Sequence, residues 1–234
     1  IFTMRGLLSA GHLPGAEEDH ETGVRQVAVR IRRLQCRRDI RKRGQHFERR
    51  WQMKVKARVV ITPDKVVVGE KILIFESSGA DLLVEIYKKK VGNYPKFFKM
   101  DPLARLGFIA SELLLGEETP RKTDCEDRAV IFFNRSASLA DDAEYQKTIG
   151  KDGFFPSPAV FVYTLPNIVT GEIAIRNKYY GETSFYVLEE KDDKVMKEIV
   201  EQAFQDPVTE SAIAGWLECS DSEHFEAELY LIEK

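Results

Sequence analysis

The sequence is poor in the residues on which most catalytic and metal sites depend. It holds 3 cysteines and 4 histidines in 234 residues. The cysteines, Cys36, Cys125 and Cys219, are odd in number and widely spaced, which gives neither a disulfide framework nor a zinc-ligand spacing. Three of the histidines, His12, His20 and His46, lie in the first 52 residues. We therefore expect reduced thiols, no metal and no cofactor, with His224 as the one histidine of the remaining chain.

A long apolar segment is also missing. No run of 18 or more apolar residues occurs, and an acidic cluster, Glu17 to Asp19, stands where an apolar secretion signal would lie. These absences predict a cytoplasmic protein that does not contact a membrane. With 43% hydrophobic residues, the chain is long enough for one domain with a substantial core.

The charge is divided unevenly along the chain. Residues 1–52 carry 12 Lys and Arg against 6 Asp and Glu, whereas residues 53–234 carry 23 against 32. The first segment uses Arg almost exclusively and the second favours Lys. One interpretation is an Arg-rich arm that binds nucleic acid or another acidic surface. We favour the other, a basic extension that is non-native or disordered and precedes a natural start at Met53, so that nucleic acid is not an expected partner.

The first part of the main domain, residues 53–234, predicts strands and two amphipathic helices. Strands are expected over residues 54–61 and 71–75. A helix over residues 80–90 places Leu82, Leu83, Ile86 and Tyr87 on one face, and Gly92 is expected to end it. A second helix has Asp101 as its N-cap, Pro102 as its first residue and an end near Gly116. Its core stripe contains Leu103, Leu106, Ala110 and Leu113.

The second part continues the alternation of strands and helices. Unbroken apolar runs predict interior strands over residues 128–133 and 210–218, and residues 183–188 predict a further strand. Residues 224–232 alternate strictly and predict a half-exposed or edge strand. Helices are expected over residues 139–149 and 192–204, and after "TLPN", where Ile168, Val169, Ile173 and Ile175 are expected to be buried. This order predicts an α/β fold, a layered mixed sheet packed by helices.

Two stretches, "VIFFNRSASLADDAEYQKTI" and "FFPSPAVFVYTLPNIVTGEIAIRNKYYGETSFYV", carry a resemblance to a known family. They resemble the β-ketoacyl-acyl-carrier-protein synthases, which have the thiolase fold, and they cover only the N-terminal half of that family. The positions that match the family spacing are Ser157, Pro158, Phe161, Asn167, Gly171 and Gly181. The resemblance implies a half-length, thiolase-like domain of fatty-acid or polyketide biosynthesis. Ketosynthase-like proteins encoded beside aryl-polyene or lipid synthesis enzymes are the most similar.

The resemblance fails at the catalytic nucleophile. In that family a cysteine stands at a strand-to-helix turn, where the helix amino end stabilises its thiolate. The family spacing puts this position at or near Glu190, in the acidic segment "LEEKDD". Carboxylates there would raise the pKa of a neighbouring thiol, and Asp192 and Asp193 fit a cap and first turn of the next helix. We therefore expect a pseudoenzyme, a non-catalytic partner or scaffold without a Cys-His-His site.

An active enzyme is the alternative. It would be an acyl-carrier-dependent acyltransferase or condensing enzyme with Glu190 or Cys219 as a substitute nucleophile. His224 lies on an alternating strand and is expected to be a surface histidine, and Cys125 is expected to be a loop or strand-entry residue.

The segment "YPKFFKM" is the candidate partner-binding stretch. Aromatic and basic residues are interleaved in it: Tyr94, Lys96, Phe97, Phe98 and Lys99. Such residues fit either the core or a surface that binds an acyl carrier protein. The resemblance also implies a homodimer, or a heterodimer with a ketosynthase, because family members pair through a sheet edge.

Overall fold

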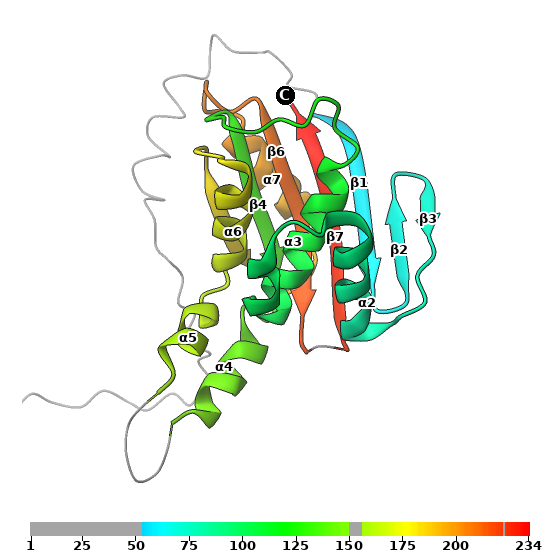
Figure 1. Cartoon of the computed structure of the whole chain (residues 1–234). Coiled ribbons are helices and arrows are strands. Elements are labelled where there is room, and N and C mark those ends of the chain that lie inside the picture. The colour runs from blue at the N-terminus through cyan, green and yellow to red at the C-terminus, as the bar shows by residue number, and fades with distance from the viewer. Residues whose placement is uncertain (1–52, 150–155, 222) are drawn as a thin grey trace, which may run out of the picture. The chain divides into compact units, whose positions relative to one another are not determined.

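One seven-stranded mixed sheet runs through the structure, a computed structural model that describes residues 53–149, 156–221 and 223–234 (Figure 1). The strands lie in the order β3-β2-β1-β7-β6-β4-β5. Their bounds are Lys54–Thr62 (β1), Lys65–Val68 (β2), Lys71–Leu73 (β3), Arg128–Asn134 (β4), Thr183–Val187 (β5), Ser211–Cys219 (β6) and Phe225–Glu233 (β7). The pairs β4–β5 and β4–β6 are parallel, and every other pair is antiparallel. The predictions for residues 1–52, including the Arg-rich arm, lie outside the described residues.

The two faces of the sheet are covered unequally. Helices α2 (Gly79–Ile86), α3 (Pro102–Leu115) and α6 (Ile168–Asn177) pack on one face, and α7 (Asp193–Ala203) packs on the other (Figure 1). The larger core therefore lies on the α3 face. Short helices connect these elements: η1 (Tyr87–Val91), η2 (Pro95–Lys99), α4 (Leu139–Lys147), α5 (Pro158–Phe161) and η3 (Val162–Thr164).

Helix α3 is the centre of the larger core. The Asp101 carboxylate caps it by accepting hydrogen bonds from the backbone N–H groups of Leu103 (2.8 Å) and Ala104 (3.1 Å). Pro102 at the first position is preset for a helical turn and has no N–H group to lose. The predicted core stripe of this helix is buried, and it packs against α6, β1, β6 and β7.

Most predicted elements are confirmed, with three corrections. The alternating strand β7 is half-exposed along its length as predicted, but it is interior rather than an edge, since it pairs with both β1 and β6. Strand β2 was not predicted, because its four residues are too few to show a clear period. Ile175 is exposed rather than buried. Residues two apart on a helix point in nearly opposite directions, so Ile173 and Ile175 cannot both face the sheet.

Among the described residues, no single helix is long and apolar enough to cross a membrane. One bent helix pair, Pro158–Thr164 with Ile168–Asn177, meets that length and composition together, with a 95° bend between its members.

Candidate functional site

The position expected for a nucleophile lies in the loop between β5 and α7. Glu190 is exposed there, and Asp192 caps α7 through hydrogen bonds from the backbone N–H groups of Lys194 (2.9 Å) and Val195 (3.1 Å). The cap prediction is confirmed. The amino end of α7, which would have to stabilise a thiolate, already has a carboxylate as its partner.

An ion-pair network that was not predicted surrounds this loop. The Lys191 ammonium contacts Glu226 (2.7 Å) and Glu228 (2.8 Å) of β7. Glu228 also accepts hydrogen bonds from Arg58 (2.6 Å) and the Tyr230 hydroxyl (2.5 Å). Burial alone would raise the pKa of Glu228, but the hydrogen bonds from Lys191, Tyr230 and Arg58 hold that pKa at about 2. The charges beside this loop therefore satisfy one another.

Cys219 is the buried thiol of the described chain, and its surroundings oppose ionisation. It lines a cavity of about 40 Å³ near the amino end of α3, together with Pro102, Arg105 and Phe225. Burial, with the charges of Asp101, Asp141 and neighbouring carboxylates, raises the pKa of Cys219 to about 12. The capping carboxylate of Asp101 cancels the favourable field of the helix end. The cavity has room for about one water molecule rather than an acyl group.

Cys125 occupies the position predicted for it, and His224 is a surface residue as predicted but lies just before β7 rather than on the strand. Cys125 forms an isolated bridge with Tyr179 before β4, and burial and Asp127 raise its pKa. His224 is exposed, and its Nδ1 lies 2.9 Å from Asp221. Within the described chain, neither residue forms part of a nucleophile–base pair. Cys125 makes a backbone bridge to Tyr179, and the partner of His224 is a surface carboxylate.

The family-matching positions surround α5, α6 and the start of β5. Ser157 caps α5 by accepting from Val160 N (3.4 Å), Pro158 is the first residue of α5, and the Phe161 ring stacks near Tyr145. Asn167 is the N-cap residue of α6, and its carbonyl accepts from the Thr170 hydroxyl (2.7 Å). Gly171 lies inside α6, and Gly181 precedes β5 against the backbone of Glu126 and Arg128. These residues shape the fold.

The candidate partner-binding stretch divides between core and surface. Phe97 is fully buried and stacks on Tyr87 at 4.4 Å, so the interpretation of Phe97 as a surface anchor is wrong. Its ring belongs to the larger core. Phe98 is 50% exposed, and Lys99 is exposed.

The other two residues of this stretch are tied to α6. Lys96 pairs with Glu172 at 2.6 Å. The guanidinium carbon of Arg176 lies over the half-buried Tyr94 ring, 5.1 Å from the ring centroid. Phe98 and Lys99 are therefore the members of the stretch whose side chains are open to a partner.

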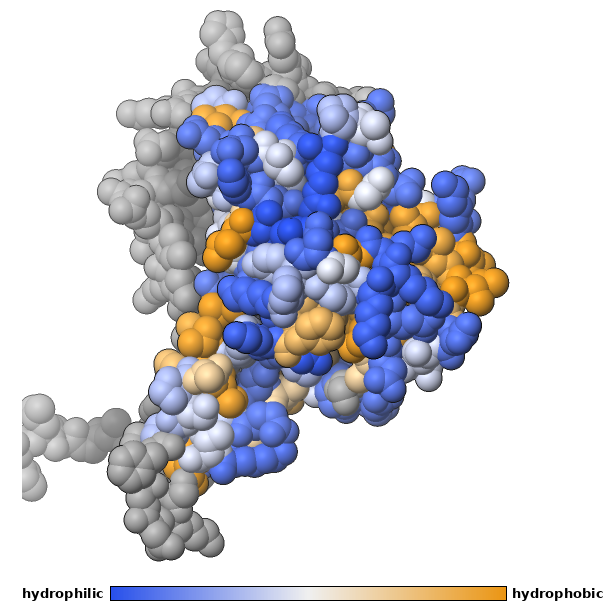
Figure 2. Space-filling model, viewed as in Figure 1, coloured by the Kyte–Doolittle hydropathy of each residue, from blue (hydrophilic) through white to orange (hydrophobic). Residues whose placement is uncertain are grey.

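A second surface is apolar and lies near the β5 end of the sheet. We call α4, α5 and η3 the arm; in Figure 1, α4 and α5 project beyond the end of the sheet. Figure 2 shows apolar side chains over this region. The exposed apolar residues are Leu139, Phe161, Val162 and Leu165 on or beside the arm, with Tyr180 and Val187 at β5.

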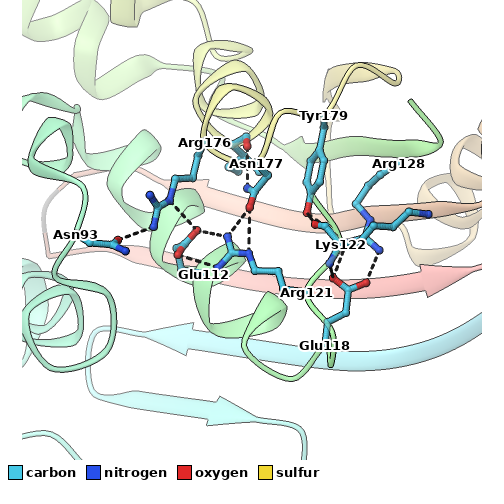
Figure 3. Close-up of polar contacts among 10 residues, drawn as sticks. Asn93, Glu112, Glu118, Arg121, Lys122, Arg128, Arg176, Asn177 and Tyr179 are labelled. Carbon is cyan, nitrogen blue, oxygen red and sulfur yellow. Dashed lines mark hydrogen bonds and ion pairs between the residues drawn. The ribbon is translucent and has the colours of Figure 1, made fainter. Parts of the chain in front are cut away.

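A polar network at the opposite end of β4 fastens the loop between α3 and β4 (Figure 3). Arg121 forms a bidentate pair with Glu112 and also binds Asn177, while Arg128 forms a bidentate pair with Glu118. Arg128 is almost completely buried, and the Tyr179 ring and hydroxyl lie beside it. Burial alone would lower the pKa of Arg128, but Glu118 and Tyr179 raise it. The charged groups of this network hydrogen-bond to one another, which indicates that the network has a structural role.

An open apolar groove runs beside α7. It has a volume of about 740 Å³. Its floor and walls come from α7, β1, β4, β6 and β7, and include Met53, Val55, Met196, Val200 and Ile232. The rim carries Asp193, Lys197 and Glu201. Among the described residues, α7 is the helix that packs on this face, and the groove lies beside it.

Solved structures of ketosynthases are similar to this fold. The ishigamide ketosynthase/chain length factor matches with a TM-score of 0.59 and 15% identity, over 79% of this chain and 62% of that chain. The ketosynthase ApeO in complex with its chain length factor ApeC, from Xenorhabdus doucetiae, matches with a TM-score of 0.52 and 12% identity, over 79% of both chains. AntDE:AntF, a type II polyketide synthase acyl-carrier protein in complex with its ketosynthase bound to the hexaketide, matches with a TM-score of 0.51 and 11% identity, over 78% of this chain and 58% of that chain.

The fold is therefore the thiolase-like fold of ketosynthases and chain length factors, as the sequence resemblance predicted. This chain spans about 62% of the first of these chains and is about as long as the chain it matches in the ApeO–ApeC complex. No protein-family model and no curated protein matches the sequence.

Proposed function

We propose that this chain is a non-catalytic, ketosynthase-like subunit that pairs with a ketosynthase in fatty-acid or polyketide biosynthesis of the aryl-polyene type. The proposal rests on the retained fold and on the exposed, ion-paired loop around Glu190 and Lys191, where the family spacing puts the nucleophile. The similar structures described as complexes with a chain length factor or a carrier protein support the proposed kinds of partner.

The pairing surface in this proposal is the free edge of β5 with the apolar residues beside it. Among the described residues, β5 is the last strand of the sheet and pairs on one side only, with β4. An edge strand offers unpaired backbone groups to another strand, and exposed apolar side chains next to it favour burial. The proposal includes pairing with a second copy of the chain when no ketosynthase is present.

Size-exclusion chromatography with light scattering tests this pairing. The full chain, co-expressed with a catalytic ketosynthase, is expected to elute as a stable 1:1 complex at micromolar concentration. The chain alone is expected to form a dimer. Monomers in both samples would contradict the proposal.

The surface around Phe98 and Lys99 is the proposed docking site for an acyl carrier protein. Phe98 offers an exposed ring, and Lys88, Lys90 and Lys99 are exposed cations on η1 and η2. The Phe98 ring lies 5.1 Å from Tyr87 of η1, so the two short helices form one surface. A basic rim around an aromatic residue fits an acidic partner.

Lys99→Glu is expected to weaken carrier-protein binding about tenfold in low salt, because a like charge replaces an attractive one. Lys71→Glu, at an exposed lysine of β3, is the matched control and should bind as the parent does. Fluorescence anisotropy of a labelled carrier protein measures both. Equal affinities for the two variants would count against this docking site.

A further inference from the structure

One wall of the groove beside α7 is formed by a single face of that helix. The residues of α7 that line the groove are Asp193, Met196, Lys197, Val200 and Glu201. Met196 and Val200 are apolar, buried and one turn apart. The other three are charged, are also one turn apart, and lie along the rim. Because residues at this spacing share one side of a helix, the groove has an apolar wall below a row of acidic, basic and acidic side chains.

The floor of the groove is the part of the sheet beside α7. The helix itself packs on β4 and β6, whereas the groove extends over β7 and β1, where Tyr230, Ile232 and Val55 line it. Val55 is 54% exposed. An apolar stretch of sheet next to a packed helix is the surface that a second helix, lying alongside the first, would bury.

The charged row indicates which kind of helix fits. Lys197 and Glu201 form a long ion pair of 3.7 Å and keep much of their side chains in solvent, and Asp193 is exposed. All three can therefore reach a partner. A helix lying alongside α7 would oppose them best with a basic, an acidic and a basic residue, each one turn from the next. The side of that helix that faces the sheet would have to be apolar.

The same row disfavours two other occupants. A second copy of the chain whose own α7 was centred on this stripe would place Lys197 against Lys197 and Asp193 against Glu201, so that like charges would meet. An acyl ligand with an anionic head group would lie beside two carboxylates and one ammonium. A basic amphipathic helix meets neither objection.

We propose that the groove beside α7 binds an amphipathic α-helix of a partner protein, with basic residues of that helix opposite Asp193 and Glu201. Its apolar stripe lies on Met196, Val200 and Val55. The groove, of about 740 Å³, is within the range of roughly 300–1,000 Å³ over which pockets bury most of a ligand. It therefore has room for a row of apolar anchors. This surface is separate from the β5 edge and from the surface around Phe98, and the inference does not depend on pairing with a ketosynthase.

Fluorescence anisotropy of the full chain with two synthetic peptides tests the charged part of the site. Both peptides are amphipathic helices with a leucine stripe. The first flanks the stripe with Lys, Glu and Lys one turn apart, and the second with Glu, Lys and Glu. The parent chain is expected to bind the first peptide at least about tenfold more tightly than the second. The triple variant Asp193→Lys, Lys197→Glu, Glu201→Lys inverts the row, so it should prefer the second peptide.

Two valine variants test the apolar part of the site. Val55 lies on the floor of the groove, whereas Val208, 50% exposed between α7 and β6, lies outside it. Val55→Asn is expected to weaken binding of the first peptide about fivefold, because the bound helix would cover that side chain. Val208→Asn is the matched control and should bind as the parent does.

Several results would overturn the proposal. The parent might bind the two peptides equally or bind neither, the triple variant could keep the parent's preference, or the two valine variants could lose affinity equally. A smaller oligomer of Val55→Asn in light scattering would assign the groove to a second copy instead. Displacement of the first peptide by dodecanoic acid would assign it to an acyl ligand.

Discussion

At the scale of single residues, two glycines in the family-matching positions have different physical reasons to be there. A Cβ atom added to Gly181 would lie 2.4 Å from the Arg128 carbonyl oxygen and 2.8 Å from that of Glu126, so the backbone itself blocks any side chain. At Gly171, inside α6, an added Cβ meets nothing within 4 Å. Only the first glycine is required by packing.

Gly181→Ala is therefore expected to lower the free energy of unfolding by about 1–3 kcal/mol, because backbone atoms must move to relieve the overlap. Gly171→Ala is expected to raise the free energy of unfolding by roughly 0.5–1 kcal/mol, because alanine has the higher helix propensity and its methyl group would contact no other atom. Urea unfolding followed by circular dichroism measures both. Effects of the same sign would show that the close approach at Gly181 is wrong.

The sequence predicted the Asp192 cap of α7 but not the contacts around the loop before it. The assignment of the nucleophile position to Glu190 stays a prediction. Lys191 and Glu226 are 35 residues apart, and their ion pair depends on β7 lying beside the loop, which local periodicity does not encode.

At the scale of elements, the strands were predictable where burial imposed a clear pattern. β4 and β6 are unbroken apolar runs because each pairs on both sides and is covered on both faces. The alternation of β7 correctly indicated that one face of the strand is more exposed than the other. A pattern along one strand does not reveal how many neighbouring strands it pairs with. β2 was missed because four residues are too few for a period to be recognised.

The edge position of β5 leads to a prediction about assembly. Val187, 52% exposed at the end of β5, should be buried in the proposed pairing, so Val187→Asp is expected to weaken the complex at least tenfold, or about 1.4 kcal/mol. Val208, 50% exposed between α7 and β6, is the matched control, and Val208→Asp should leave the complex intact. Light scattering over a dilution series distinguishes them. Pairing that is insensitive to Val187→Asp would place the interface elsewhere.

At the scale of the whole molecule, the layers explain which surfaces are open. Three helices cover the α3 face, and the Glu112–Arg121 and Glu118–Arg128 pairs fasten the loop that leads from it into β4. One helix covers the other face and leaves the groove beside α7. The alternation of helices and strands predicted the layers, but the sequence did not show how many helices lie on each side.

The surroundings of the two candidate substitute nucleophiles support the proposed lack of catalysis. A thiol that reacts with an acyl group needs a lowered pKa and a cavity, whereas Cys219 has a pKa of about 12 and about 40 Å³ beside it. Glu190 is exposed to water, which would compete for any acyl intermediate. These two residues were the candidates for a substitute nucleophile, and neither environment favours that role.

The most direct measurement is intact-mass analysis of the full chain after incubation with an acyl carrier protein that bears a labelled acyl group. The account predicts an unchanged mass for this chain at every time point, while a catalytic ketosynthase in a parallel reaction gains the acyl mass. A stable acyl adduct on this chain, mapped by peptide analysis to Glu190, Cys219 or any other residue, would contradict the account.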